Sequence, residues 1–223
     1  MSSLPSSGQT ADFDPVSGVH SHRAFSRQVN QVACDGDVFA VAIISLENFD
    51  MTTQVAGFEA SDDLLAAVGR ALTNHQSATT IVARTGDHEF SVLSFGFAGD
   101  LDRWVSPVVT SARMAITDWA TGHSAFELDL VIPPTVRTGA AVGSGAQVRD
   151  EAGRALTVAI NNVEGDEVVH YRKEDRRLQA IEAEMKRNSR TLEALTDETV
   201  LIANQRIEPV SYTHLTLPTT PYV

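Results

Sequence analysis

The sequence predicts an α+β domain in which helices pack on a mixed β-sheet that contains a central β-hairpin. Two runs rich in β-branched and aromatic residues, Thr80–Arg84 and Glu89–Phe95, flank the segment Thr85–His88, which contains Gly and Asp. Gly and Asp tolerate the backbone conformations of a tight hairpin. Apolar residues at helical spacing occur before and after the hairpin, and such a mixed order is typical of α+β folds.

The composition excludes several classes of protein. The chain has 223 residues, enough for one domain and part of another. Its net charge of −12 disfavours nucleic acid and anionic membranes, which attract basic proteins. No apolar run approaches the roughly 20 residues that span a bilayer, and Cys34 is the single cysteine, so no intrachain disulfide can form. We therefore expect a cytoplasmic protein with no membrane segment and no nucleic-acid partner.

The elements before the hairpin follow from local patterns. Residues 1–13 are largely polar and rich in serine, so we expect them to be disordered. Asp14–Phe25 predicts a turn leading into a helix that Ser21 caps. Val38–Leu46 is a continuous apolar run of the kind found in strands buried on both faces. Ser61–Asn74 carries an apolar stripe at helical spacing, with Ser61 or Asp62 as its cap.

The elements after the hairpin complete the predicted domain. Leu101–Ala120 predicts a long helix, although Pro107 lies near its start. Pro133 and Pro134 interrupt the strand predicted for Leu128–Val142, which places that strand near a sheet edge. A helix over Glu151–Val163 and a closing strand over Val168–Tyr171 follow.

The hairpin sequence also resembles a known motif. Arg84–Phe90, RTGDHEF, resembles the R-x-G-G-D-E-F hairpin of the GGDEF (diguanylate cyclase) family, with the second Gly and the Asp replaced. Asp14–Phe25 is similar to the family's D-x-L-T-G-L-x-N-R-R-x-F opening. Residues 45–65 are similar to its D-x-D-x-F-K-x-x-N-D-x-x-G-H-x-x-G-D-x-x-L segment. The resemblance implies a nucleotidyl-cyclase-like fold over residues 14–171.

Most positions that carry chemistry in the family differ in this chain. The resemblance places the metal ligands at Ser45 and His88, and neither is a carboxylate, the group that Mg²⁺ prefers. It places basic contacts to the triphosphate at Asp50 and within residues 161–166, where Asn162 and Asp166 stand. It places guanine recognition at Thr53 and Asp62. We therefore expect no intact catalytic residue in the degenerate motif, which comprises Gly86, Asp87, His88, Glu89 and Phe90.

These replacements predict a catalytically inactive, regulatory domain of cyclic di-GMP signalling that needs no cofactor. Asp62 and Gly86 are its candidate nucleotide-binding residues, GTP is its candidate ligand, and a homodimer is a candidate assembly. We expect His88 to be a solvent-exposed hairpin residue. The alternative is an active cyclase in which three other carboxylates hold Mg²⁺, and these are Glu47, Asp87 and Glu89.

A second family site also differs. The product-inhibition motif R-x-x-D of the family corresponds to positions Ser77 and Thr80, so we expect no cyclic di-GMP there.

The C-terminal part changes character. Residues 172–195 are rich in charge and predict a linker helix. Residues 196–209, with the strand Val200–Ile207, resemble the start of an EAL (cyclic di-GMP phosphodiesterase) domain, which the parent chain would continue. Residues 210–223 resemble a translated sequencing adaptor, so we expect this tail to be non-native.

Overall fold

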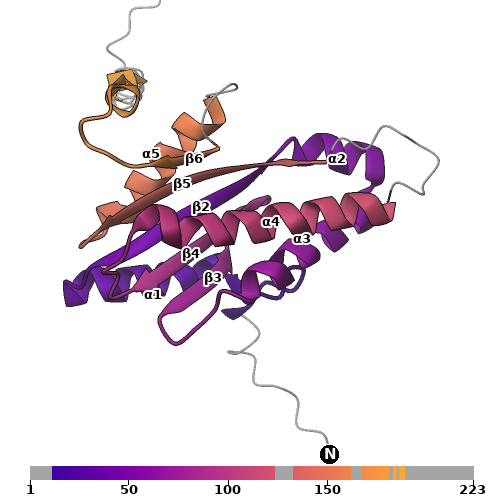
Figure 1. Ribbon diagram of the computed structural model, residues 1–223, viewed down its shortest axis with the longest axis horizontal. Coiled ribbons are helices and arrows are strands. Elements are labelled where there is room, and N and C mark those ends of the chain that lie inside the picture. The colour runs from indigo at the N-terminus through magenta and orange to yellow at the C-terminus, as the bar shows by residue number, and fades with distance from the viewer. Residues whose placement is uncertain (1–11, 124–132, 162–166, 181–182, 185, 189–223) are drawn as a thin grey trace, which may run out of the picture. The chain divides into compact units, whose positions relative to one another are not determined.

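The computed structural model describes residues 12–123, 133–161, 167–180, 183–184 and 186–188 (Figure 1). The chain divides into two compact units, Met1–Ala183 and Glu184–Val223. The described residues of the second unit, 184 and 186–188, are helical. All elements below belong to the first unit.

The first unit is built on a six-stranded sheet with strand order β1-β3-β4-β2-β5-β6. The β2–β4, β2–β5 and β3–β4 pairs are antiparallel, whereas β1–β3 and β5–β6 are parallel. The sheet is therefore mixed, and the hairpin of β3 and β4 lies inside it, as predicted. The strands are β1 (His20–Ser21), β2 (Phe39–Glu47), β3 (Thr80–Arg84), β4 (Glu89–Phe95), β5 (Thr135–Gly143) and β6 (Val168–His170).

Helices cover both faces of the sheet (Figure 1). On one face α3 and α4 lie side by side over a core that includes Ile44, Phe90 and Val92 of the sheet. On the other face α1 and α5 pack on a second core that includes Phe39 and Leu93. The helices are α1 (His22–Asp35), α2 (Phe49–Ala56), α3 (Phe58–Thr73), α4 (Leu101–His123) and α5 (Gln147–Asn161).

Several predicted elements are confirmed. The two hairpin strands have the predicted bounds. Eight of the nine residues of β2 are buried, because alternate side chains of this strand enter the two cores. Ser21 caps α1, and its side chain accepts a hydrogen bond from the Ala24 amide.

The start of the third helix was predicted wrongly. Neither Ser61 nor Asp62 caps it, because α3 begins at Phe58, directly after Gly57. Gly57 has φ 88° and ψ 167°, a conformation open mainly to glycine, and so it separates α3 from the short helix α2. Ser61 is consequently buried inside α3 at 3% exposure.

The last strands and helices also correct the prediction. β5 begins at Thr135, after the two prolines, so no proline interrupts it, and it lies between β2 and β6 rather than at a sheet edge. Pro107 lies inside α4, whose first turn is held by Asp100, since its side chain accepts from the Arg103 amide at 2.9 Å. The predicted residues 128–132 lie outside the described part.

The contact between α5 and β5 is unusually close. A Cβ atom on Gly139 would lie 2.0 Å from the Leu156 nitrogen and 2.3 Å from the Ala152 carbonyl oxygen. Only a residue without a side chain fits there. Further along, Leu178 is 1% exposed and packs against the α5–β6 core, within the helical residues 176–180. The predicted linker helix, 172–195, is corrected at its start, because residues 172–175 are not helical, whereas 176–180, 183–184 and 186–188 are; its other residues lie outside the described part.

Candidate functional site

The candidate site lies where the end of β2 meets the hairpin turn. Ser45 of β2 pairs in register with Glu89 of β4, and the Leu46 amide donates to the His88 carbonyl at 3.1 Å. The fold therefore brings the two sequence segments with candidate metal ligands next to each other, as the resemblance implies. What the side chains do there differs from one residue to the next.

Ser45 is engaged within its own strand. It is 1% exposed, and its hydroxyl donates to the Glu47 Oε1 atom at 2.6 Å. Ile43 belongs to the core under α1 and α5, so Ser45, two residues later, faces the same side. This hydrogen bond holds the Glu47 carboxylate beside Ser45. The Ser45 hydroxyl is itself a poor ligand for Mg²⁺.

His88 is not the exposed residue that we predicted. Its ring stacks on Phe49 with the ring centres 6.0 Å apart and the planes 22° apart. Phe49 belongs to the core under α3 and α4 and offers a flat apolar surface that covers the imidazole. The Nδ1 atom is buried and has no hydrogen-bond partner within the described part of the chain. Ser45 and His88 therefore face different layers of the fold.

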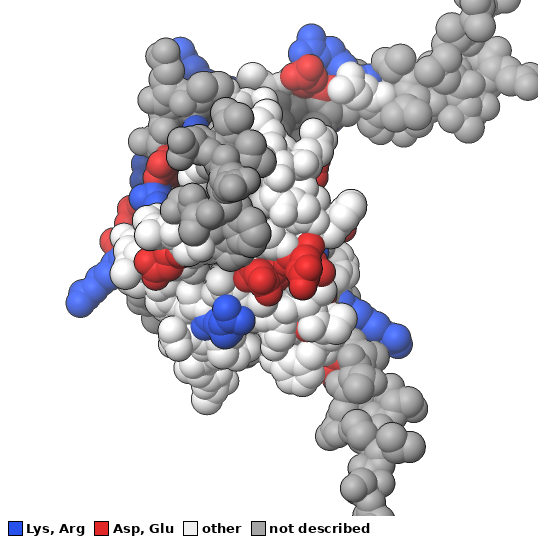
Figure 2. All heavy atoms as spheres, turned by 90° about the vertical axis from the view of Figure 1, so that its right-hand side faces the viewer, with Lys and Arg blue, Asp and Glu red and all other residues white. Residues whose placement is uncertain are grey.

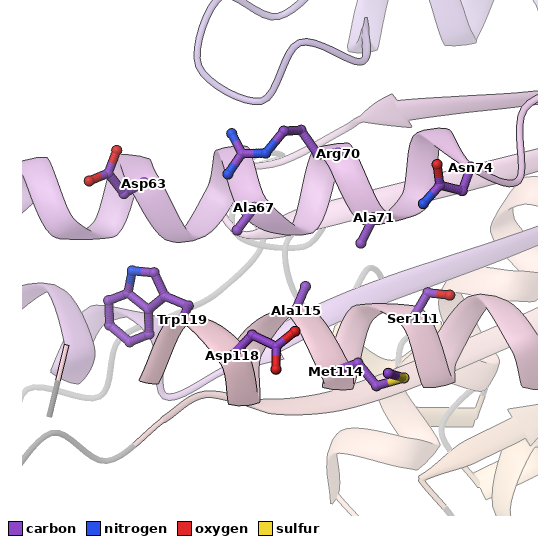
Figure 3. A pocket seen from close by; sticks show the side chains of 10 residues that line it. All are labelled: Asp63, Ala67, Arg70, Ala71, Asn74, Ser111, Met114, Ala115, Asp118 and Trp119. Atoms are coloured by element: carbon purple, nitrogen blue, oxygen red, sulfur yellow. The ribbon is translucent and has the colours of Figure 1, made fainter. Parts of the chain in front are cut away.

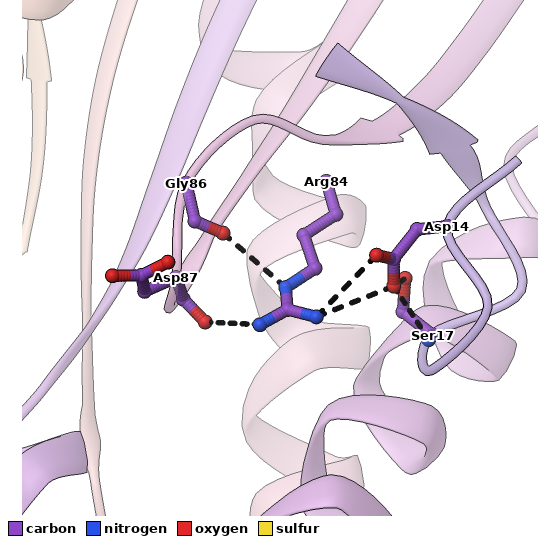
Figure 4. Close-up of polar contacts among 5 residues, drawn as sticks. All are labelled: Asp14, Ser17, Arg84, Gly86 and Asp87. Carbon is purple, nitrogen blue, oxygen red and sulfur yellow. Dashed lines mark hydrogen bonds and ion pairs between the residues drawn. The ribbon is translucent and has the colours of Figure 1, made fainter. Parts of the chain in front are cut away.

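The turn of the hairpin is held by Arg84 (Figure 4). Its guanidinium donates to the Gly86 carbonyl at 3.2 Å and to the Asp87 carbonyl at 2.6 Å. The same group reaches Asp14 with an Nη1–Oδ1 distance of 3.3 Å. The turn backbone also closes on itself, because the Thr85 amide donates to the Glu89 carbonyl at 2.9 Å. We call Asp14, Ser17 and Arg84, with the two carbonyls, the hairpin clasp.

Asp14 is the acidic end of the clasp. Its carboxylate accepts from the Ser17 amide at 2.8 Å and from the Ser17 hydroxyl at 2.6 Å. Burial alone would raise the pKa of Asp14, but the bonds from Ser17 and the charge of Arg84 outweigh it, so the pKa lies below its ordinary value of 3.8. The carboxylate is therefore ionised at neutral pH.

The positions assigned to guanine recognition are joined to each other. The Ser61 hydroxyl lies 2.9 Å from the Thr53 hydroxyl and 3.0 Å from the Gly57 carbonyl. The family pattern has Gly at position 61 and Asn at position 53, so two hydroxyls that bond each other replace an open glycine and an amide. Asp62 lies on α3 with an exposed side chain. Gly86 lies in the hairpin turn beside the Glu89 side chain.

The surroundings of these residues are acidic. Residues 47–74 contain one basic residue, Arg70, and five acidic ones, which are Glu47, Asp50, Glu59, Asp62 and Asp63. Figure 2 looks onto the end of the molecule where α2 lies and shows acidic atoms near the middle of that face. Among the described residues, no three His, Cys, Asp or Glu side chains are grouped closely enough to hold a metal ion. Negative potential of this kind disfavours a triphosphate unless cations compensate it.

The remaining predicted positions are Asn162, Asp166, Ser77 and Thr80. Asn162 and Asp166 lie outside the described residues. Ser77 and Thr80 bond each other through their backbones, with a Ser77 nitrogen to Thr80 oxygen distance of 3.1 Å. Neither residue offers a charged group.

The clasp itself was missed in the sequence. Asp14 and Arg84 both belong to motif positions that match the family pattern, whereas most functional positions do not. Two matched, oppositely charged residues 70 positions apart are a signal from which the pair could have been found.

Residues 11–106 match the family model "Diguanylate cyclase, GGDEF domain". Over 83 residues the chain is 31% identical to the cyclic di-GMP phosphodiesterase PdeB of Shewanella oneidensis. That match covers 37% of this chain and 10% of the relative, so the chain spans about a tenth of that protein's length.

Two solved structures share the fold. The GGDEF domain of DgcB from Caulobacter crescentus, in complex with c-di-GMP, aligns with a TM-score of 0.57 and 20% identity, over 72% of this chain and 96% of its own. The S helix-GGDEF-EAL part of Vibrio cholerae LapD, bound to c-di-GMP, aligns with a TM-score of 0.60 and 17% identity, over 86% and 44%. Among the described residues, no helix has the length and apolar character needed to cross a membrane.

Proposed function

We propose that this domain is catalytically inactive and regulatory. The premise is that residues 11–106 match a GGDEF domain of cyclic di-GMP signalling proteins and that the chain has the corresponding fold. The domain would control an EAL phosphodiesterase domain attached to it in the parent chain. The observation that carries this proposal is the state of Ser45 and His88. Both stand where the family holds its metal, and both are engaged inside the protein.

The chemistry explains why these two positions matter most. Joining two GTP molecules places negative charge on phosphoryl oxygens, which Mg²⁺ and basic side chains must balance. The Ser45 hydroxyl donates a hydrogen bond to Glu47, and His88 stacks on Phe49. Asp50 stands where the family has a lysine, and it would repel a phosphate. The site thus lacks both the metal ligands and one of the cations that the reaction requires.

The guanine positions support the same proposal. The hydroxyl pair Ser61 and Thr53 ties α3 to α2, so a base would have to break this bond to reach Thr53. Asp62 remains exposed and could accept hydrogen bonds from guanine nitrogens. GTP binding without turnover therefore rests on Asp62, with Gly86 at the turn as the candidate for close approach.

One observation favours the alternative, an active cyclase with an atypical Mg²⁺ site. Glu47 lies two residues beyond Ser45, and Glu89 pairs with Ser45, so both carboxylates are on the side of the sheet that Ser45 faces. Asp87, the third candidate, has an exposed side chain at the turn. The clasp binds Asp87 through its backbone carbonyl and not through its side chain.

The link to a phosphodiesterase is supported by the relatives. PdeB is named a cyclic di-GMP phosphodiesterase, and the LapD structure contains a GGDEF and an EAL domain in one chain. The predicted linker 172–195 and the EAL-like residues 196–209 support the proposal that such a domain follows this one in the parent chain.

Titration calorimetry of GTP into the full chain, with and without Mg²⁺, followed by chromatography of the incubated nucleotide, tests the proposal. We expect no cyclic di-GMP. If GTP binds, Asp62→Ala should weaken binding, whereas Asp37→Ala, at an exposed position in the α1–β2 loop, should not. Formation of cyclic di-GMP that Glu47→Gln or Glu89→Gln abolishes would establish the alternative.

A further inference from the structure

A long groove runs between α3 and α4 on the outer surface of the domain (Figure 3). Its volume is about 680 Å³. The floor of the groove consists of alanine side chains, and the Trp119 indole lies at one end. Figure 3 shows Ala67 and Ala71 of α3 pointing toward α4, and Ala115 and Trp119 of α4 pointing toward α3. Small residues on a helix surface let another helix approach closely.

The rims of the groove carry the larger side chains. Asp63, Arg70 and Asn74 line the α3 rim, and Met114 and Asp118 line the α4 rim (Figure 3). Met114 is 61% exposed, which leaves most of an apolar side chain in water. Burying it against another molecule would be favourable by the hydrophobic effect.

The α3 rim carries Arg70 together with Asp63, and the α4 rim carries Asp118. Arg70 lies on one rim and Asp118 on the other, and neither forms an ion pair within the described part of the chain. His75, next to the groove, lies 2.9 Å from the Ser111 hydroxyl. Burial lowers the pKa of His75, so it adds no positive charge at neutral pH. Arg70 is thus the cation of this surface, and Asp63 and Asp118 are its acids.

This arrangement is complementary to itself. A two-fold axis along the groove places α3 of one copy on α4 of the other. Arg70 of each copy then lies over the rim that carries the other copy's Asp118, and the contact occurs twice. We propose that the α3–α4 groove is a homodimer interface, in which a second copy of this chain covers Met114 and pairs its Arg70 with Asp118. The inference does not rest on the proposed function.

The size of the surface limits the affinity. α3 has 16 residues, which corresponds to a length of about 24 Å. A face two helices wide, about 20 Å, would bury roughly 500 Å² per copy, near the lower limit for a specific interface. The dimer should therefore be weak and reversible, so charge reversal at one residue should change it measurably.

Sedimentation equilibrium of the full chain tests the interface over roughly 1 µM to 1 mM, a range that brackets a weak contact. We expect reversible dimerisation. Arg70→Glu and Asp118→Arg should each raise the dimer Kd by about tenfold or more, because each sets like charges against each other twice. An equimolar mixture of the two variants should dimerise again, because both pairs in the mixed dimer are then oppositely charged.

Matched charge reversals away from the groove serve as controls. Lys173→Glu and Asp37→Arg change exposed residues by the same charge and should leave the Kd within about twofold. Unchanged circular dichroism would show that all variants fold. A chain that stays monomeric to the highest concentration overturns the proposal. So does a dimer that resists both reversals, or a pair of variants that does not recover when mixed.

Discussion

The two sides of the hairpin turn differ in what their residues do. On the clasp side, Asp14 and Arg84 match the family pattern, and their bonds join the N-terminal turn to the carbonyls of Gly86 and Asp87. On the β2 side, Ser45 and His88 stand at positions where the family has carboxylates. The first side holds the turn in place, and the second side is where chemistry would occur. The residues that hold the turn therefore match the family pattern, whereas the residues at the positions of the metal ligands do not.

The replaced residues on the β2 side make specific contacts inside the protein. Ser45 bonds Glu47, His88 packs on Phe49, and Ser61 bonds Thr53. Each replacement has found a partner inside the protein. Mutations on the two sides should accordingly differ in their effect on stability, and none is expected to remove an existing cyclase activity.

The largest loss of stability should come from a substitution at Gly139, where α5 packs closely on β5. We expect Gly139→Ala to lower the free energy of unfolding by about 3 kcal/mol or more, because its Cβ would meet the backbone of α5. Gly153→Ala, on the same helix with nothing within 4 Å of its Cβ, should instead gain about 0.5–1 kcal/mol. Urea unfolding measures both. Equal losses at the two glycines would contradict the close contact.

Arg84→Ala should have the next largest effect. It removes the bonds to two turn carbonyls and leaves Asp14 without its cation, so we expect a loss of about 2–3 kcal/mol. Arg23→Ala is a matched control at an exposed position on α1 and should cost less than about 0.5 kcal/mol. Thermal and urea unfolding of both variants measure the difference. If Arg84→Ala is as stable as the wild type, the clasp adds nothing to stability.

Ser61→Ala should cost less, about 1 kcal/mol, because a buried hydroxyl loses its bonds to Thr53 and Gly57. Ser106→Ala on α4, where the serine is exposed, serves as the control and should be neutral or slightly stabilising. If Ser61→Ala creates GTP binding detectable by calorimetry, then the hydroxyl pair also closes the guanine position.

The smallest expected effect is on pH dependence. The folded pKa of Asp14 lies below its ordinary value of 3.8, so its stabilising contribution is fully present above that value. The contribution is lost as the pH falls through the folded pKa, because protonation then breaks the bonds to Ser17 and Arg84. Urea unfolding between roughly pH 6 and pH 2 should show a shallower acid loss in Asp14→Asn than in the wild type. Parallel curves would assign the acid loss to other carboxylates.

Much of the fold could be predicted from local patterns. The hairpin bounds and the doubly buried β2 follow from β-branched runs and turn residues, which act over a few positions. The boundary at Phe58 could not be predicted, because it depends on the positive φ of Gly57 rather than on a capping side chain. The interior place of β5 could not either, because strand neighbours are fixed by tertiary packing.

The site was predictable in part. The replacements at Ser45 and His88 are visible in the sequence, and the fold brings both segments together. The stacking of His88 on Phe49 and the bond between Ser61 and Thr53 join residues of different elements or different turns. Such contacts depend on the relative placement of helices and strands, which residue spacing does not encode.

The clasp also bears on the order in which the chain folds. Asp14 and Arg84 are 70 residues apart, so their contact closes a long loop, and closing it is entropically unfavourable until the intervening elements have formed. β3 and β4 are joined by a short turn and can pair earlier. We therefore expect the ion pair to form after the main folding barrier, so that Arg84→Ala accelerates unfolding while leaving the folding rate nearly unchanged.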